Sequence, residues 1–404
     1  MRRLAPDGVN YHLSRVTSSA SKALSASAVY WTAFIGLFFD YYDLYLFVYL
    51  EKVIAADLNL SSTTSNILQF AGIAGVGLGA LVFGYLADRF GRERMLILIF
   101  GVYVLGLAGL SLAPNFWSVL VARVIASLAL GAEWGISHAW MNERVSRTRR
   151  YRFASLLQFA ILGGLLAALA YRFILPVTGW RWLFAASILP VVVLSALRWR
   201  LLVASPERAE PLSQTKSPTS NLPPAPSMAK VGVTFARCLA LASLTIGSGY
   251  VNVFFMKELP QSTLYTVLFW ANIVPGMLLG TVLISRFGVR TALFSYAASL
   301  IALSLLAWSE HLPGGKLTFA LLLPLLNGVP FGLMGAYFNE VFVRYRTMLS
   351  GSAYNFGRIL AGFSPFIIMR LGLHEGGNYF LFSAALGIGV LAVGWGIRDE
   401  LRSA

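Results

Sequence analysis

Apolar stretches of about 20 residues, long enough to span a membrane, recur along the whole chain between polar connections. At ~1.5 Å per helical residue, each stretch can cross a hydrocarbon core about 30 Å thick. Helices are expected because a backbone in lipid must satisfy its hydrogen bonds within its own segment. The pattern predicts twelve spans, at 27–50, 65–87, 95–113, 117–141, 153–175, 182–202, 231–256, 262–284, 291–309, 317–339, 351–371 and 378–397.

A polar segment divides these spans into two groups of six. Residues 203–230 are rich in Pro and Ser and cannot bury an apolar face, so a solvated linker is expected there. The predicted organisation is an N-terminal half at 27–202 and a C-terminal half at 231–397. A polar tail is expected at each end, at 1–26 and 398–404.

The two halves share short sequences at one constant shift along the chain. Arg89–Gly91 falls on Arg286–Gly288, and Asn142–Glu143 falls on Asn339–Glu340. In parallel repeats of this kind a solute site lies near the bilayer midplane, and the halves rock against each other around it.

The distribution of charge indicates the orientation of the spans. Charged residues are only 12% of the chain, about half the fraction of a typical soluble protein. Most of the 32 Lys and Arg residues fall in connections on one side, including the group from Arg198 to Lys230. Basic connections face the cytoplasm. We therefore expect a multi-pass plasma-membrane protein with both termini in the cytoplasm, and no nucleic-acid partner, despite the net charge of +15.

Signals for enzymatic chemistry are absent from the sequence. The single cysteine, Cys238, rules out a disulfide within the chain. His374 and Glu375 are followed by Gly-Gly-Asn, so the second histidine of a zinc-protease motif is missing. No phosphate-binding P-loop is present either. No metal, cofactor or enzyme activity is expected.

Three motifs carry a family resemblance. Gly84–Arg94 reads GYLADRFGRER, Gly131–Gly135 reads GAEWG, and Phe39–Asp43 reads FDYYD. Together they resemble signatures of the major facilitator superfamily, in particular its metabolite, aromatic-acid and sugar–proton symporter branches. The resemblance implies an all-α integral membrane fold, with twelve transmembrane helices in two six-helix pseudo-repeats, that functions as a monomer. The chain departs from the pattern at Ser285, which takes the place of Asp88 in the second half.

Ionisable residues in the first and fourth spans are the candidates for proton coupling. Asp40 and Asp43 share a helix face, and Asp43 and Arg123 lie at similar depths, ~10 Å from the outer edge. We expect Asp43 to carry the proton, Arg123 to be its switchable partner and Asp40 to tune the pair. The alternative is a fixed salt bridge between the two spans. Glu133 is expected to line the cavity as a second proton site, or else to pair with an Arg on another span.

Arginines in the second half are the candidates for binding the solute. Arg358 and Asn355 share a helix face, and counting along the spans puts both Arg237 and Arg358 ~10 Å from the inner edge. Because Arg binds carboxylates through two parallel hydrogen bonds, we expect an anionic solute held by Arg358 with help from Arg237. The alternative is that both Arg neutralise Glu133. Further polar and aromatic candidates for the site are Gln158, Tyr250, Asn252 and Trp134.

The basic connections are candidates for an inner gate. Asp88 is expected against the N-terminus of a neighbouring helix, with Arg89 and Arg92 pairing with Glu143. An equivalent pair of Arg286 with Glu340 is expected in the second half. The alternative is that these charges only set the orientation.

These features predict a secondary active transporter that moves a small organic solute, expected to be a carboxylate metabolite, by proton-coupled alternating access. The expected partners are the solute, protons and the lipid bilayer. The alternatives are a sugar or polyol symporter, a drug or metabolite efflux antiporter, and a solute sensor without net transport.

Overall fold

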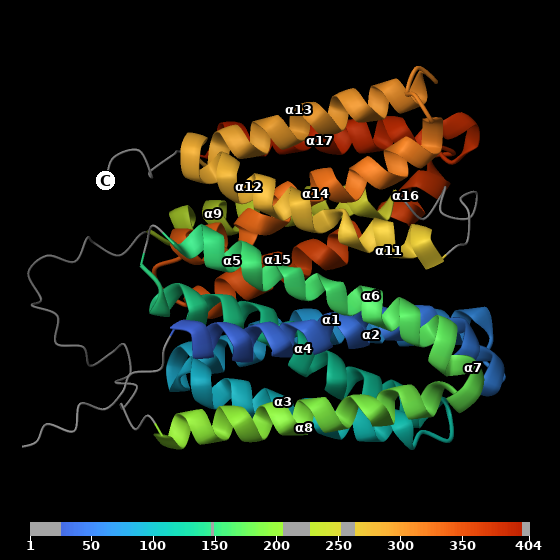
Figure 1. Ribbon diagram of the computed structural model, residues 1–404, viewed down its shortest axis with the longest axis vertical. Coiled ribbons are helices and arrows are strands. Elements are labelled where there is room, and N and C mark those ends of the chain that lie inside the picture. Colours follow the sequence, from blue (N-terminus) through green and yellow to red (C-terminus); the bar gives the residue numbers. More distant parts are fainter. Residues whose placement is uncertain (1–25, 147–148, 205–226, 252–262, 398–404) are drawn as a thin grey trace, which may run out of the picture.

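The computed structural model describes residues 26–146, 149–204, 227–251 and 263–397, and over these residues the chain is helical without strands. The first group of helices comprises α1 (Ala26–Asp57), α2 (Ser62–Phe90), α3 (Arg92–Ser111), α4 (Phe116–Arg144), α5 (Arg150–Gln158), η2 (Phe159–Leu162), α6 (Gly163–Leu169), the π-helical η3 (Ala170–Ile174), α7 (Leu175–Thr178) and α8 (Trp180–Ala204). The second group comprises α9 (Met228–Tyr250), α11 (Thr263–Ala271), α12 (Ile273–Phe287), α13 (Val289–Trp308), α14 (Gly315–Val341), α15 (Arg346–Ala361), α16 (Ser364–Arg370), η5 (Glu375–Gly377) and α17 (Tyr379–Trp395). The two groups are stacked, the first below and the second above in Figure 1.

The helices account for the twelve predicted spans. Ten stretches of the described chain are long and apolar enough to cross a membrane, including 150–178, which joins α5 to α7, and 263–287, which joins α11 and α12. The eleventh span is α15 and α16, interrupted at residues 362 and 363, and the twelfth is the shorter α17. The predicted fold class is confirmed. The eleventh span begins at Arg346, earlier than the sequence pattern predicted.

The internal repeat extends to the closest helix contacts. Gly79 of α2 lies against the carbonyl group of Leu128 in α4, and at the equivalent place Gly276 of α12 lies against the carbonyl group of Leu325 in α14. A Cβ atom at either glycine would overlap that carbonyl. Small residues allow helix backbones to approach this closely in lipid, so each half is built around the same contact.

The turns after α2 and α12 are also equivalent. Gly91 has φ 100° and Gly288 has φ 87°, a region that residues with a Cβ seldom adopt. Each glycine ends one helix and begins the next within a single residue. The repeated Arg-Phe-Gly sequence therefore marks a sharp reversal in both halves.

The halves meet along α2, α4 and α5 on one side and α12, α14 and α15 on the other. A Cβ on Gly84 would come within 2.8 Å of the Met348 backbone, and one on Gly135 within 2.9 Å of Gly351. Ser155 of α5 donates a hydrogen bond to the Met277 carbonyl at 3.0 Å. The halves are therefore in direct contact near the end that carries the connections after α2 and α4. We call this the basic end, at the left in Figure 1.

Candidate functional site

Asp43 and Arg123 form a buried ion pair between α1 and α4. Arg123 Nη1 lies 3.3 Å from Asp43 Oδ2, and the two side chains are 5% and 0% exposed. The Arg123 guanidinium also lies 3.9 Å from the centre of the Phe47 ring. The sequence predicts that these two residues lie at similar depths, and the structure shows them in contact.

Glu133 is paired with an arginine that the sequence did not single out. Arg198 of α8 lies 2.8 Å from Glu133 and donates to the Thr32 carbonyl at 2.6 Å. Ser137 donates a further hydrogen bond to Glu133. The sequence places Arg198 only among the basic residues on one side of the membrane, but α8 continues to Ala204 and keeps this side chain 3% exposed. Neither Arg237 nor Arg358 neutralises Glu133.

Asp40 differs from the other two carboxylates because no arginine is paired with it. It is buried, and its Oδ2 has no hydrogen-bond partner among the described residues. It interacts electrostatically with Glu133, Arg198, Asp43 and Arg358. Among the buried ionisable residues of α1, α4 and α8, the three carboxylates therefore outnumber the two guanidinium groups by one.

Arg358 lies between the halves, among tyrosines. Its Nη2 donates to the Tyr354 hydroxyl at 3.1 Å, and its guanidinium lies 5.7 Å from the Tyr41 ring centre. The Tyr41 and Tyr354 hydroxyls are 3.2 Å apart, which joins α1 to α15. Arg358 is half-buried and makes no ion pair within the described part of the chain. Its N–H groups can therefore donate to the carboxylate of a ligand.

Gln158 and Trp134 belong to the same central network. Gln158 accepts from Tyr41 and from Trp134 Nε1, both at 3.3 Å. Trp134 stacks on the Tyr354 ring with centroids 3.9 Å apart. The centre therefore has flat aromatic walls and a few oriented polar groups, as small-molecule sites commonly do.

Aromatic residues also close the centre on the side away from the basic end. Tyr45 of α1 packs edge-on against Trp270 of α11 with centroids 4.6 Å apart. Tyr250, at the end of α9, lies within electrostatic reach of both Tyr45 and Arg358. Asn252, expected beside Tyr250, lies outside the described residues.

Two residues predicted to assist Arg358 lie elsewhere. Asn355 donates to the Gly131 carbonyl at 2.9 Å and to the Gly351 carbonyl at 3.0 Å, so it fastens α15 to α4. Arg237 is exposed in the wall of a pocket at the basic end, beside Gly396. The pairing of Arg237 with Arg358 fails because α15 begins earlier than predicted, which places Arg358 farther from the basic end.

Asp88 caps the N-terminus of α15 from across the interface. The backbone N–H groups of Thr347 and Met348 donate to its two oxygens at 3.1 and 3.0 Å. Arg92 bridges Asp88 at 2.9 Å and Glu143 at 3.0 Å. Charges from both halves are thus joined at the basic end, which is closed in this conformation.

Other expected contacts at this end are not formed. Arg89 is exposed and lies over the Phe90 ring, and Glu143 is contacted instead by Arg346 at 3.8 Å. Arg286 is exposed at the end of α12. Glu340 is bound by two α5 residues, Tyr151 at 2.8 Å and Arg150 at 3.8 Å. The expected pairs of Arg89 with Glu143 and Arg286 with Glu340 are not formed. Glu340 is bound from the first half because α5 packs on α14.

A sequence profile of the Major Facilitator Superfamily matches residues 33–369. The chain belongs to the major facilitator superfamily. It is 27% identical over 380 residues to the cis,cis-muconate transport protein of Acinetobacter baylyi, covering 90% of this chain and 89% of the relative. It is 30% identical to a putative metabolite transport protein of Haemophilus influenzae, with 88% and 89% covered. In fold it is similar to the proton:xylose symporter XylE, with TM-score 0.70 at 17% identity and 92% and 95% of the two chains covered.

Family membership identifies the chain as a multi-pass transporter and not an enzyme. The residues of this transporter that sequence reasoning missed are Arg198, Tyr41 and Arg150. Arg198 lies near the end of an apolar run, and Tyr41 between two candidate aspartates. Tyr41 is next to Asp40 in the sequence and therefore on a different helix face, and no local pattern shows which helix it faces.

Proposed function

We propose that this transporter moves a small organic carboxylate together with a proton by alternating access. The observation that carries the proposal is Arg358, a half-buried guanidinium between the two halves with no ion pair among the described residues. A charged side chain without an ion-pair partner within a membrane protein is costly and marks a candidate functional site. A carboxylate solute would supply the missing partner through two parallel hydrogen bonds.

The surroundings of Arg358 favour a flat, conjugated anion. The rings of Tyr41, Tyr354 and Trp134 are large, rigid surfaces, and the first two also offer hydroxyl groups. Gln158 adds an amide that already links these groups. The similarity to a muconate transport protein agrees with a carboxylate of this kind.

Charge balance suggests how proton and solute are coupled. With all groups ionised, Asp40, Asp43 and Glu133 exceed Arg123 and Arg198 by one negative charge, which offsets Arg358 in the empty transporter. A bound carboxylate adds a second negative charge, which favours uptake of a proton by a nearby carboxylate. Asp40 is the member of the cluster without an arginine partner, so we assign the transported proton to Asp40. Asp43 and Arg123 remain the pair that holds α1 against α4.

In the transport cycle, a conformation with the basic end closed would alternate with one in which it is open. The contacts of Asp88, Arg92 and Glu143 with α15 join the halves and must break for the solute to leave there. By the positive-inside rule, the basic end would face the cytoplasm, with both termini on that side. The predicted gate residues Arg89, Arg286 and Glu340 would act there through their charge, not through the pairs first expected.

A second candidate is a proton-coupled sugar symporter. The hydroxyl and amide groups of Tyr41, Tyr354 and Gln158 could bind a sugar as well as an acid. A neutral sugar would leave Arg358 without an ion-pair partner, so we rank this function second.

Purified transporter in liposomes that enclose a pH-sensitive dye would test the proposal. Addition of cis,cis-muconate outside should acidify the interior, whereas xylose should not. Arg358→Gln should abolish the signal, and Arg370→Gln, an exposed arginine at the end of α16, should retain it. Acidification by xylose alone, or full activity of Arg358→Gln with carboxylates, would refute the carboxylate assignment.

A further inference from the structure

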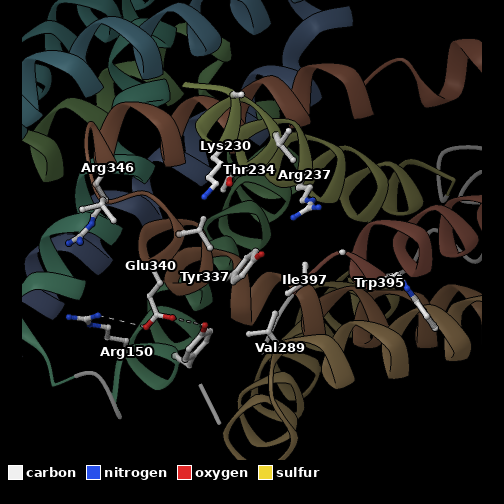
Figure 2. Close-up of a pocket in the computed structure, with 16 residues that line it drawn as sticks. Arg150, Lys230, Thr234, Arg237, Val289, Tyr337, Glu340, Arg346, Trp395 and Ile397 are labelled. Carbon is white, nitrogen blue, oxygen red and sulfur yellow. Dashed lines mark hydrogen bonds and ion pairs between the residues drawn. The ribbon is translucent and has the colours of Figure 1, made fainter. Parts of the chain in front are cut away.

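A large pocket opens at the basic end, separate from the central site. Its volume is about 1190 Å³, and both halves contribute to its wall. Arg150 and Tyr151 come from α5 of the first half. The second half supplies Lys230, Thr234 and Arg237 from α9, Glu340 from α14, Arg346 from the start of α15 and the end of α17. Figure 2 shows these side chains around one open space.

The pocket is strongly cationic. Lys230, Arg237, Arg150 and Arg346 line it, and Glu340 is its one acidic residue. Glu340 is already engaged by Arg150 and by the Tyr151 hydroxyl. Lys230 and Arg237 make no ion pair within the described part of the chain. The pocket therefore holds more positive charge than its own residues neutralise.

The unpaired cations are arranged on one helix face. Lys230, Thr234 and Arg237 are spaced by four and three residues on α9, so their side chains project to the same side. In Figure 2 they border the space from one helix, with Tyr337 across from them. An ammonium, a guanidinium and a hydroxyl thus converge on one volume, as required for a ligand with several acceptor oxygens.

Apolar side chains occupy the exposed margin of the same pocket. Val233, Val343 and Trp395 line it and are 52%, 67% and 72% exposed. A Trp at the end of a span is typical of the membrane interface. The margin can therefore contact the apolar part of an amphiphile whose charged group lies deeper.

We propose that this pocket binds a phosphate-bearing anion, and that the bound anion stabilises the conformation with the basic end closed. Arg150 belongs to one half and Arg346, Lys230 and Arg237 to the other, so closure gathers like charges that repel one another. An anion between them removes this repulsion and contacts both halves. Since it binds the closed state more tightly than the open state, it shifts the population toward closure. A phospholipid headgroup and a soluble phosphoester share this chemistry.

Binding to the full chain in nanodiscs separates the two sources. In phosphatidylcholine nanodiscs, inorganic pyrophosphate is titrated against the native protein and Lys230→Gln/Arg237→Gln. In a second arm, phosphatidylglycerol is added to the nanodiscs. The matched control, Arg94→Gln/Arg200→Gln, removes two exposed cations from the first half outside the pocket. The fraction with the basic end closed is read from spin-label distances between cysteines at the exposed positions 90 and 287, with Cys238 replaced by Ala.

We expect pyrophosphate or phosphatidylglycerol to increase the closed fraction in the native protein and in the control. The response should fall at least tenfold in Lys230→Gln/Arg237→Gln. A response to pyrophosphate identifies a soluble ligand, and a response to phosphatidylglycerol alone identifies a lipid. No response to either anion, or the same response in all variants, would overturn the proposal. Because muconate-dependent acidification is a separate readout, failure here leaves the proposed transport function intact.

Discussion

Asp43 on α1 and Arg123 on α4 are 80 positions apart in the chain and meet at 3.3 Å in an enclosed part of the first half. The neighbouring Asp40, one helical turn away, has no such partner. Two carboxylates on one face of α1 are thus distinguished by their surroundings. This difference underlies the first prediction.

Asp40→Asn should uncouple transport from the proton without loss of stability. The substitution removes a buried carboxylate that has no arginine partner, so folding is expected to be unaffected. Uptake driven by an inward proton gradient should be lost, while exchange of labelled for unlabelled solute continues. Asp57→Asn, on the exposed end of the same helix, is the matched control. Undiminished gradient-driven uptake in Asp40→Asn would exclude Asp40 as the proton carrier.

Asp43→Asn should destabilise the protein, and any loss of proton-driven uptake should follow from that loss of stability. Arg123 would remain buried without its carboxylate, and breaking one side of a buried pair costs about 3–5 kcal/mol. The thermal unfolding midpoint in detergent should therefore fall well below those of Asp40→Asn and native protein. Equal midpoints for the two variants would contradict the different partners seen for these residues.

Arg198→Met should destabilise the first half, and a second substitution should restore part of the loss. The single change leaves Glu133 buried without a cation, at a cost of about 3–5 kcal/mol. Glu133→Gln added to it removes the orphaned charge, so the double variant should unfold at a higher temperature than Arg198→Met alone. If the fall in unfolding temperature of the double variant equals the sum of the falls in the two single variants, Arg198 and Glu133 do not interact in the membrane.

Arg358→Lys should weaken carboxylate binding while keeping the charge. A lysine cannot form two parallel hydrogen bonds to a carboxylate, so half-maximal uptake should require about tenfold more muconate, or ~1.4 kcal/mol. Competition between labelled and unlabelled muconate in liposomes measures this change. If the concentration dependence matches that of native protein, Arg358 does not bind the carboxylate directly.

Asp88→Asn should loosen closure of the basic end. The change weakens the cap on α15 and the contact with Arg92. A cysteine at Ser352, which is 1% exposed behind this closure, should then be alkylated several-fold faster from the basic side. The assay uses Cys238→Ala as background and native Asp88 as reference. An unchanged rate of alkylation would assign Asp88 to orientation and not to gating.

Some site geometry followed from helix counting because it is local. The similar depths of Asp43 and Arg123 were visible from their positions in spans 1 and 4, and the spans are antiparallel neighbours. The contact of Asp88 with the N-terminus of a neighbouring helix was expected, and the structure shows that helix to be α15. The pairing of Asp43 with Arg123 needed only where each residue lies along its own helix.

Pairings that depend on the rotation and precise start of a helix were not predictable in this way. The helix α15 begins a few residues earlier than predicted, and each residue adds ~1.5 Å of depth. Arg358 therefore lies farther from the basic end than Arg237. Glu340 faces Arg150 instead of Arg286 because α5 crosses onto α14.

The sequence by itself determined the twelve spans, their division into two halves and the repeat between them. Long apolar runs in lipid must satisfy their backbone hydrogen bonds locally, so a helix follows directly from such a run. Only the tertiary structure decided which arginine neutralises which carboxylate. Arg198 reaches Glu133 across 65 positions, and Asp40 is left without a cation, because helix packing alone sets which side chains lie within a few ångströms of each other.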